Sequence, residues 1–68
     1  MTEKDAMNLC GAVIYIGAVN RGLYPDKNLP AAITLINEVC DTTYGPSESI
    51  RAADHALQTL NSYLEALL

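Results

Sequence analysis

Residues 49–68 read SIRAADHALQTLNSYLEALL and carry the clearest periodic pattern in the chain. Apolar residues recur there at alternating steps of three and four, which is the a/d pattern of a helix that packs along one side over nearly three heptads. We name these six positions the leucine seam: Ile50, Ala53, Leu57, Leu60, Leu64 and Leu67. Polar residues fill the opposite side, so the segment predicts an amphipathic α-helix. Between the seam and the polar side lies a stripe of small residues and one aromatic, which gives the helix a second side for packing: Ala52, Ala56, Thr59, Tyr63 and Ala66. Its seam is expected to form core, a dimer interface, or both.

The preceding segment, from about Asn28 to Asp41, predicts a shorter amphipathic helix. Pro30 falls in its first turn, where proline is tolerated. Turn residues from Thr42 to Gly45 separate it from the C-terminal helix, and Pro46 suits the first turn of that helix.

The N-terminal segment, from Glu3 to Arg21, predicts a further helix, with Thr2 as N-cap and Gly22 as C-cap. Its apolar residues occupy two sides: Met7, Cys10, Ile14 and Ala18 on one, and Leu9, Ala12, Val13, Ile16 and Val19 on the other. A helix that is apolar nearly all round must be covered nearly all round. Gly11 and Gly17 weaken the helix, so we expect them to permit a close backbone approach. The β-branched residues are also compatible with a strand.

These segments predict an all-α fold, a small three-helix domain made of a helical hairpin plus an N-terminal apolar helix, with 1–68 as its single domain. The chain has 68 residues, of which half are apolar and 18% charged. A core this small usually needs disulfides, metal or oligomerisation to become stable. The apolar surplus therefore predicts a homodimer in which the first helix is sandwiched, and Ile14 and Ile16 are core or dimer residues together with Leu57, Leu60 and Leu64.

Composition weighs against several classes of function. The net charge is −4, and the four basic residues are scattered, which is too few for a phosphate-binding cluster. The apolar stretch from Leu9 to Val19 is too short to span a bilayer, and the residues before it lack the positive charge of a signal peptide. We therefore expect a cytoplasmic protein that binds neither nucleic acid nor membrane.

The two cysteines, Cys10 and Cys40, match no metal or redox spacing. We expect both to be small buried apolar residues. A Cys10–Cys40 disulfide, which would tie the first helix to the second, is the alternative. No cofactor and no metal site is predicted.

Catalysis needs a nucleophile with a base, paired carboxylates, or a metal, and the sequence indicates none of these, so we expect no enzyme. The single histidine, His55, lies on the polar side of the C-terminal helix and is expected to be exposed, with Arg51 placed to contact it or Asp54. Tyr24 and Tyr44 are expected to fold over the edge of the core, or Tyr24 to anchor a partner. The candidate partner-binding residues are thus Asp54, Arg51, His55 and Tyr24.

With the helices placed, the chain resembles the YmgB/AriR family of small bacterial regulators in the stretches 5–13 and 28–33 and in the C-terminal helix. The resemblance implies a helical dimer that takes part in biofilm and acid-stress regulation, with a fold similar to that of the Hha proteins. The tetrad Ala52-Ala53-Asp54-His55 also resembles one in Hha proteins, whose aspartate contributes to binding a nucleoid-associated silencer. That likeness nominates Asp54.

The function expected from these observations is that of a non-enzymatic regulator that acts through protein–protein contact. Its expected partners are a second copy of itself and another protein, for which transcriptional and signalling regulators are the candidates. The alternative is an inhibitor encoded by a phage or mobile element that blocks a host protein. A compact acidic dimer with an exposed apolar patch is compatible with both.

Overall fold

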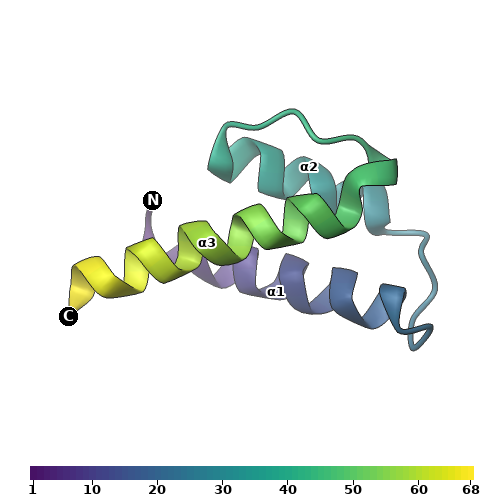
Figure 1. Cartoon of the computed structure of the whole chain (residues 1–68), viewed down its shortest axis with the longest axis horizontal. Helices are drawn as coiled ribbons and strands as arrows, with labels where there is room; N and C mark the ends of the chain where they lie inside the picture. The colour runs from purple at the N-terminus through teal and green to yellow at the C-terminus, as the bar shows by residue number, and fades with distance from the viewer.

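The computed structural model describes all residues from 1 to 68 and contains three α-helices. Their bounds are α1 (Glu3–Asn20), α2 (Leu29–Cys40) and α3 (Ser49–Leu67), with a short 3-10 turn η1 (Pro46–Glu48) directly before α3. The prediction of a small all-α domain is confirmed, and the alternative of a strand in the first segment is wrong. Figure 1 shows α2 and α3 running in the same direction and α1 running against both, while the α2–α3 connection returns along the length of α2.

The ends of α1 are fixed by the residues expected from the sequence. The Thr2 hydroxyl accepts a hydrogen bond from the Asp5 backbone N–H at 3.1 Å, and the Asp5 carboxylate accepts one from the Thr2 N–H at 3.1 Å. This reciprocal pair is a capping box. At the other end Gly22 has a φ of +73°, and the Leu23 N–H donates to the Ala18 carbonyl at 2.9 Å. Glycine suits this left-handed position because it has no Cβ.

The long α2–α3 connection is tied down by one side chain of α2. The Asn37 amide nitrogen donates to the Tyr44 carbonyl at 2.9 Å, while its oxygen accepts from the Tyr44 N–H at 2.9 Å and from the Thr42 hydroxyl at 2.8 Å. The Gly45 N–H then donates to the Glu48 carboxylate at 3.0 Å. The C-terminal helix was expected to begin at Pro46, but Pro46–Glu48 form η1 and α3 begins at Ser49.

The core lies where the three helices meet, and it consists of eight buried residues, all apolar: Leu9, Ala12, Ile16, Ile33, Ile36, Ala52, Ala56 and Leu60. The predicted burial of Ile16 and Leu60 is confirmed. From α3, however, the core takes two alanines and only one residue of the leucine seam. Small side chains let α1 and α2 approach this side of α3 together, which larger side chains would prevent.

The rest of the leucine seam is not core, contrary to the core interpretation of that seam. Ile50, Leu57, Leu64 and Leu67 expose 61%, 44%, 54% and 66% of their surface. The seam is turned about a quarter of the helix circumference away from the core, because α3 packs through the flank that holds Ala52 and Ala56. Within the seam, Leu60 is buried and Ala53 is half-buried against the core, because these two lie nearest to that flank.

Within a single chain α1 is not sandwiched, because it is covered on one side alone. Leu9 and Ile16 are buried, whereas Met7 and Ile14 expose 68% and 72%. Apart from their chain neighbours and the backbone of α1 itself, the two helical glycines, which were expected to permit a close approach, have no atom within 4 Å of where a Cβ would lie. No helix of this chain therefore makes use of the space they leave.

Candidate protein-binding surfaces

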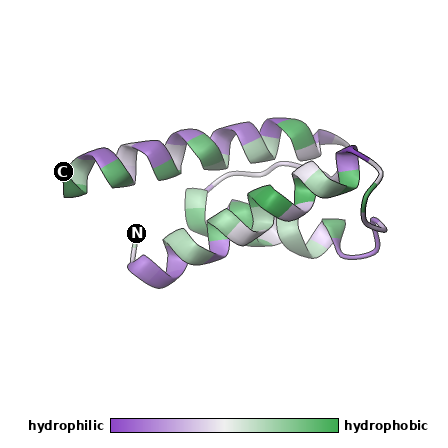
Figure 2. Cartoon of the chain, turned by 90° about the horizontal axis from the view of Figure 1, so that it is seen from below, coloured by the Kyte–Doolittle hydropathy of each residue, from purple (hydrophilic) through white to green (hydrophobic).

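Large apolar side chains of α1 and α3 stay uncovered on the two sides of one groove. We name the surface that they form the open apolar face, and its residues are Met7, Ile14, Ile50, Leu57, Leu64 and Leu67. Figure 2 shows α1 in front of α2 with apolar residues recurring along it, and apolar residues of α3 recurring beside them. Of the five residues expected as core or dimer contacts, Ile14, Leu57 and Leu64 lie on this face, and Ile16 and Leu60 lie beneath it.

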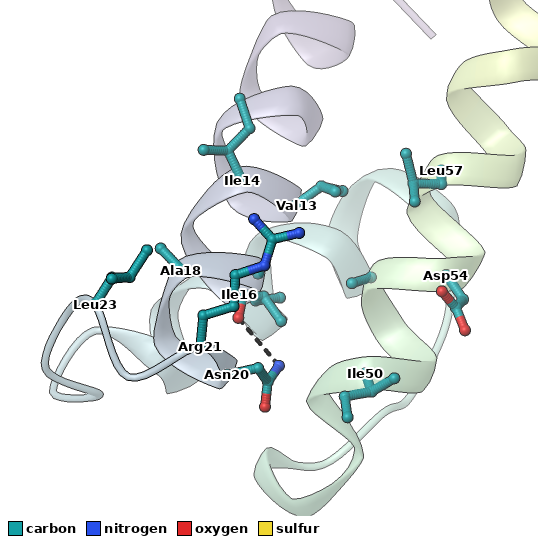
Figure 3. A pocket seen from close by; sticks show the side chains of 12 residues that line it. Val13, Ile14, Ile16, Ala18, Asn20, Arg21, Leu23, Ile50, Asp54 and Leu57 are labelled. Atoms are coloured by element: carbon teal, nitrogen blue, oxygen red, sulfur yellow. Dashed lines mark hydrogen bonds between the residues drawn. The ribbon is translucent and has the colours of Figure 1, made fainter.

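A groove runs between α1 and α3 in the middle of the open apolar face. It encloses about 580 Å³ and is lined mostly by apolar residues: Val13, Ile14, Ile16, Gly17, Ala18, Asn20, Arg21, Leu23, Ile50, Ala53, Asp54 and Leu57. In Figure 3 Val13 and Leu57 lie on its opposite walls, Ile14 lies on the α1 rim, and the Arg21 side chain reaches over it. An apolar groove between two helices is a usual place for a partner helix to bind.

Beside this groove, α3 presents an ordered polar surface. We name it the polar edge, and it consists of Arg51, Asp54, His55 and Gln58, which line a small hollow together with Tyr44. The Tyr44 hydroxyl lies 3.2 Å from His55 Nδ1, and the two rings meet edge to face with centroids 5.8 Å apart. The Arg51 guanidinium lies over the Tyr44 ring, 5.9 Å from its centroid. The α2–α3 connection thus holds the polar edge in place.

Two expectations for the polar edge are wrong. His55 was expected to be exposed, yet it is half-buried because Tyr44 covers it. Arg51 was expected to contact His55 or Asp54, but its Nη1 pairs with Glu48 at 3.1 Å, one turn earlier. Both differences arise because the contacts come from outside α3: Tyr44 of the connection contacts His55, and Glu48 of η1 pairs with Arg51.

Asp54 and Tyr24 occupy different places. Asp54 is exposed and lines both the apolar groove and the hollow of the polar edge, so it lies at the border between the two surfaces. Tyr24 exposes 64% of its surface and lines none of these hollows. The structure therefore brings Arg51, Asp54 and His55 together without Tyr24. Tyr44 does pack against the core as expected, while for Tyr24 that expectation is wrong.

The loop that carries Tyr24 is anchored by a residue that sequence reasoning missed. The Tyr15 hydroxyl donates to the Pro25 carbonyl at 2.7 Å and accepts from the Asn28 N–H at 3.1 Å. A tyrosine within a helical apolar pattern gives no signal of such a contact, because the partners lie 10 and 13 residues away. Tyr15 fixes the course of the chain from α1 to α2, and with it the exposed position of Tyr24.

The cysteines are free, so the disulfide alternative does not hold in this structure. Cys40 is half-buried and its Sγ lies 3.6 Å from the Thr59 hydroxyl, but Cys10 is exposed on α1, which contradicts its expected burial. The structure groups no three His, Cys, Asp or Glu side chains in a way that could hold a metal ion. Nor does any of its helices combine the length and apolar character of a membrane span.

Comparison of the chain with protein-family models, with curated proteins and with solved structures finds no match. The likeness to the YmgB/AriR family therefore stays a prediction from the sequence.

Proposed function

We propose that this chain is a non-enzymatic regulator in the bacterial cytoplasm that pairs with a second copy of itself through the open apolar face and binds another protein through the polar edge. The observation that carries the proposal is the open apolar face: it holds six of the ten exposed large apolar side chains of a chain that buries only eight residues. Exposed apolar patches of this kind, with a polar border, are typical of protein–protein interfaces.

The total accessible surface points in the same direction. It measures 4646 Å² for a chain of 7.3 kDa. A monomer of that mass is expected to expose about 4,200 Å². The excess is consistent with a chain that lacks part of its cover when alone, and a second copy would supply it.

The polar edge suits contact with a different protein. Arg51, Asp54 and His55 present a positive charge, a negative charge and a ring within one surface, and Tyr44 contacts the His55 ring and lies under the Arg51 guanidinium. Fixed charges at the border of an apolar contact favour specificity and a fast association. The regulatory pathway that the family resemblance implies, biofilm formation or acid stress, is part of the proposal.

The test combines binding with stability for one substitution in the polar edge. Asp54→Ala is expected to change the free energy of unfolding by less than about 0.5 kcal/mol, because Asp54 is exposed and its side chain makes no hydrogen bond within the chain. It should nevertheless abolish or strongly weaken capture of a specific protein from the native host, as identified by mass spectrometry. Glu65→Ala, an exposed carboxylate near the end of α3, is the matched control and should capture that protein as the unchanged chain does.

Equal capture by the Asp54→Ala and Glu65→Ala variants would mean that the polar edge is not the contact surface. A captured enzyme whose activity falls on binding would replace regulation by inhibition as the function. Sedimentation at micromolar concentration tests the pairing separately, and a mass of one chain there would exclude the homodimer.

A further inference from the structure

The outward side of α1 carries a narrow stripe whose ends have opposite charge. At 100° per residue, Glu3, Met7, Cys10, Ile14, Ala18 and Arg21 all fall within a sector of about 60–80°. Met7, Cys10 and Ile14 are exposed in the structure, and the chain's single ion pair, between Arg51 and Glu48, leaves Glu3 and Arg21 without an ionic partner. We name these six residues the α1 stripe.

The apolar area on this side of the molecule matches what a dimer needs. The six residues of the open apolar face are 44% to 72% exposed. At about 190 Å² for each fully exposed side chain and its backbone, they present on the order of 700 Å², close to the ~800 Å² that each partner contributes to a standard interface. A second copy of the chain brings a face of the same size and character, so it covers this area without any further partner.

Charge decides the direction in which two α1 helices can lie together. A parallel pair places Glu3 beside the partner's Glu3 and Arg21 beside the partner's Arg21, and like charges in contact are unfavourable. An antiparallel pair centred on Ile14 places Arg21 beside the partner's Met7, one helical turn from the partner's Glu3. The arginine side chain is long enough to cover that turn, so the antiparallel pair brings opposite charges together at both ends.

The two glycines of α1 are placed symmetrically about Ile14, the centre of the antiparallel pair. Gly11 and Gly17 lie three residues before and three residues after Ile14, so an antiparallel pair centred there sets Gly11 against the partner's Gly17 twice. Apart from its chain neighbours and the backbone of α1 itself, neither glycine has an atom within 4 Å of an added Cβ. Paired glycines let two helix backbones approach closely, and the close approach brings each Ile14, on the rim of its groove, against the partner's Ile14.

We infer that a second copy covers the open apolar face with its α1 antiparallel to α1, and that the two-fold axis passes beside Ile14. The inference rests on the proposed function, which supplies the homodimer, and adds its arrangement. The interface is isologous, since each chain contributes the same α1 stripe and the same α1–α3 groove.

A disulfide experiment on the full chain tests the arrangement directly. In a background with Cys10→Ala and Cys40→Ala, Ile14→Cys places one thiol beside the axis, and Met7→Cys places it seven residues away. At 1.5 Å per residue, the two Met7 positions are about 21 Å apart in the antiparallel pair. A disulfide needs Cα atoms within about 7 Å. Mild oxidation should therefore cross-link most of the Ile14→Cys chains into a covalent dimer and few of the Met7→Cys chains.

The glycines give a second test, in which stability and pairing change in opposite directions. The double variant Gly11→Ala, Gly17→Ala should raise the thermal midpoint of the dilute, monomeric chain by about 6–16 °C, because each alanine favours the helix by about 0.8–1 kcal/mol and both Cβ atoms meet open space. In a sedimentation series over concentration, its dimer dissociation constant should rise at least tenfold. Asn8→Ala, an exposed position of α1 outside the stripe, is the matched control and should leave dimerisation unchanged.

The outcomes separate the inference from the proposal on which it rests. Cross-linking of the Met7→Cys chains would refute the antiparallel arrangement, as would a glycine double variant that dimerises as tightly as the unchanged chain. In either case the homodimer itself would stand. A chain that sediments as a monomer at every concentration would overturn both the arrangement and the homodimer.

Discussion

Leu60 and Leu57 lie three residues apart on α3, and replacing each by alanine should have very different effects on stability. Leu60 is 6% exposed and belongs to the core, whereas Leu57 is 44% exposed on the groove wall. Both changes keep the helix propensity nearly constant, since leucine and alanine are both strong helix formers. The comparison therefore isolates burial.

The expected magnitudes follow from these exposures. Leucine to alanine removes three carbon atoms, which at about 0.8 kcal/mol per buried carbon is roughly 2.4 kcal/mol of lost transfer free energy. At Leu60 the cavity left in a closed core adds to this, so the free energy of unfolding should fall by about 2.5–4 kcal/mol. At Leu57 roughly half of the transfer term applies and water fills the space, so the loss should be about 1 kcal/mol.

The assay is urea unfolding followed by circular dichroism at 222 nm, because the chain has four tyrosines and no tryptophan. It should be run at a concentration low enough to keep the chain monomeric. A domain of 68 residues has about 3–10 kcal/mol of stability in total, so Leu60→Ala is expected to shift the midpoint far and to leave part of the population unfolded in water. Equal losses of unfolding free energy for the two variants in the monomer would refute the conclusion that α3 packs against α1 and α2 through the side that holds Ala52 and Ala56.

Three further expectations concern single side chains and use the same unfolding assay. Cys10→Ala should lower the free energy of unfolding by less than about 0.5 kcal/mol because Cys10 is exposed, whereas Cys40→Ala should lower it by about 1–2 kcal/mol because Cys40 packs against the core. Equal losses for the two variants would contradict the placement of these cysteines. Tyr15→Phe should lower the free energy of unfolding by about 1–2 kcal/mol, because the Pro25 carbonyl and the Asn28 N–H both lose a hydrogen bond. An unchanged urea midpoint would mean that the Tyr15 hydroxyl does not hold the loop. Asp41→Gly should stabilise the chain by about 0.5–1 kcal/mol, because Asp41 has a φ of +55° that glycine adopts without strain; a loss would point to an undetected role for its carboxylate.

Local sequence was enough to predict the three helices and the ends of α1, whereas α3 begins three residues after the expected Pro46. Thr2, Gly22 and Pro46 act on the backbone within a few residues of themselves, so the start and end of α1 and the region in which α3 begins could be read directly. The amphipathic spacing of residues 49–68 predicted a helix because its apolar residues recur with the period of an α-helix. These local signals favour the all-α class, while the strand that the β-branched residues of the first segment also allowed was excluded only by the structure.

The polar edge was predicted only in part. Arg51, Asp54 and His55 share one side of a helix by spacing alone, so their proximity could be foreseen. The cover that Tyr44 gives to His55 could not, because it depends on where the α2–α3 connection crosses α3. Asn37 sets that crossing through hydrogen bonds to Thr42 and Tyr44, and no spacing rule announces them.

What the sequence by itself determined is that α3 has a polar side, a leucine seam and a flank of small residues. Only the tertiary structure decided which of the last two faces inward. The seam has the stronger hydrophobic pattern, yet Ala52 and Ala56 are fully buried and Ile50 is 61% exposed. The physical reason is space: α1 and α2 must both reach α3 at once, and alanines permit that distance where leucines do not. The packing that closes the core thus leaves the leucines outside, where they form the open apolar face.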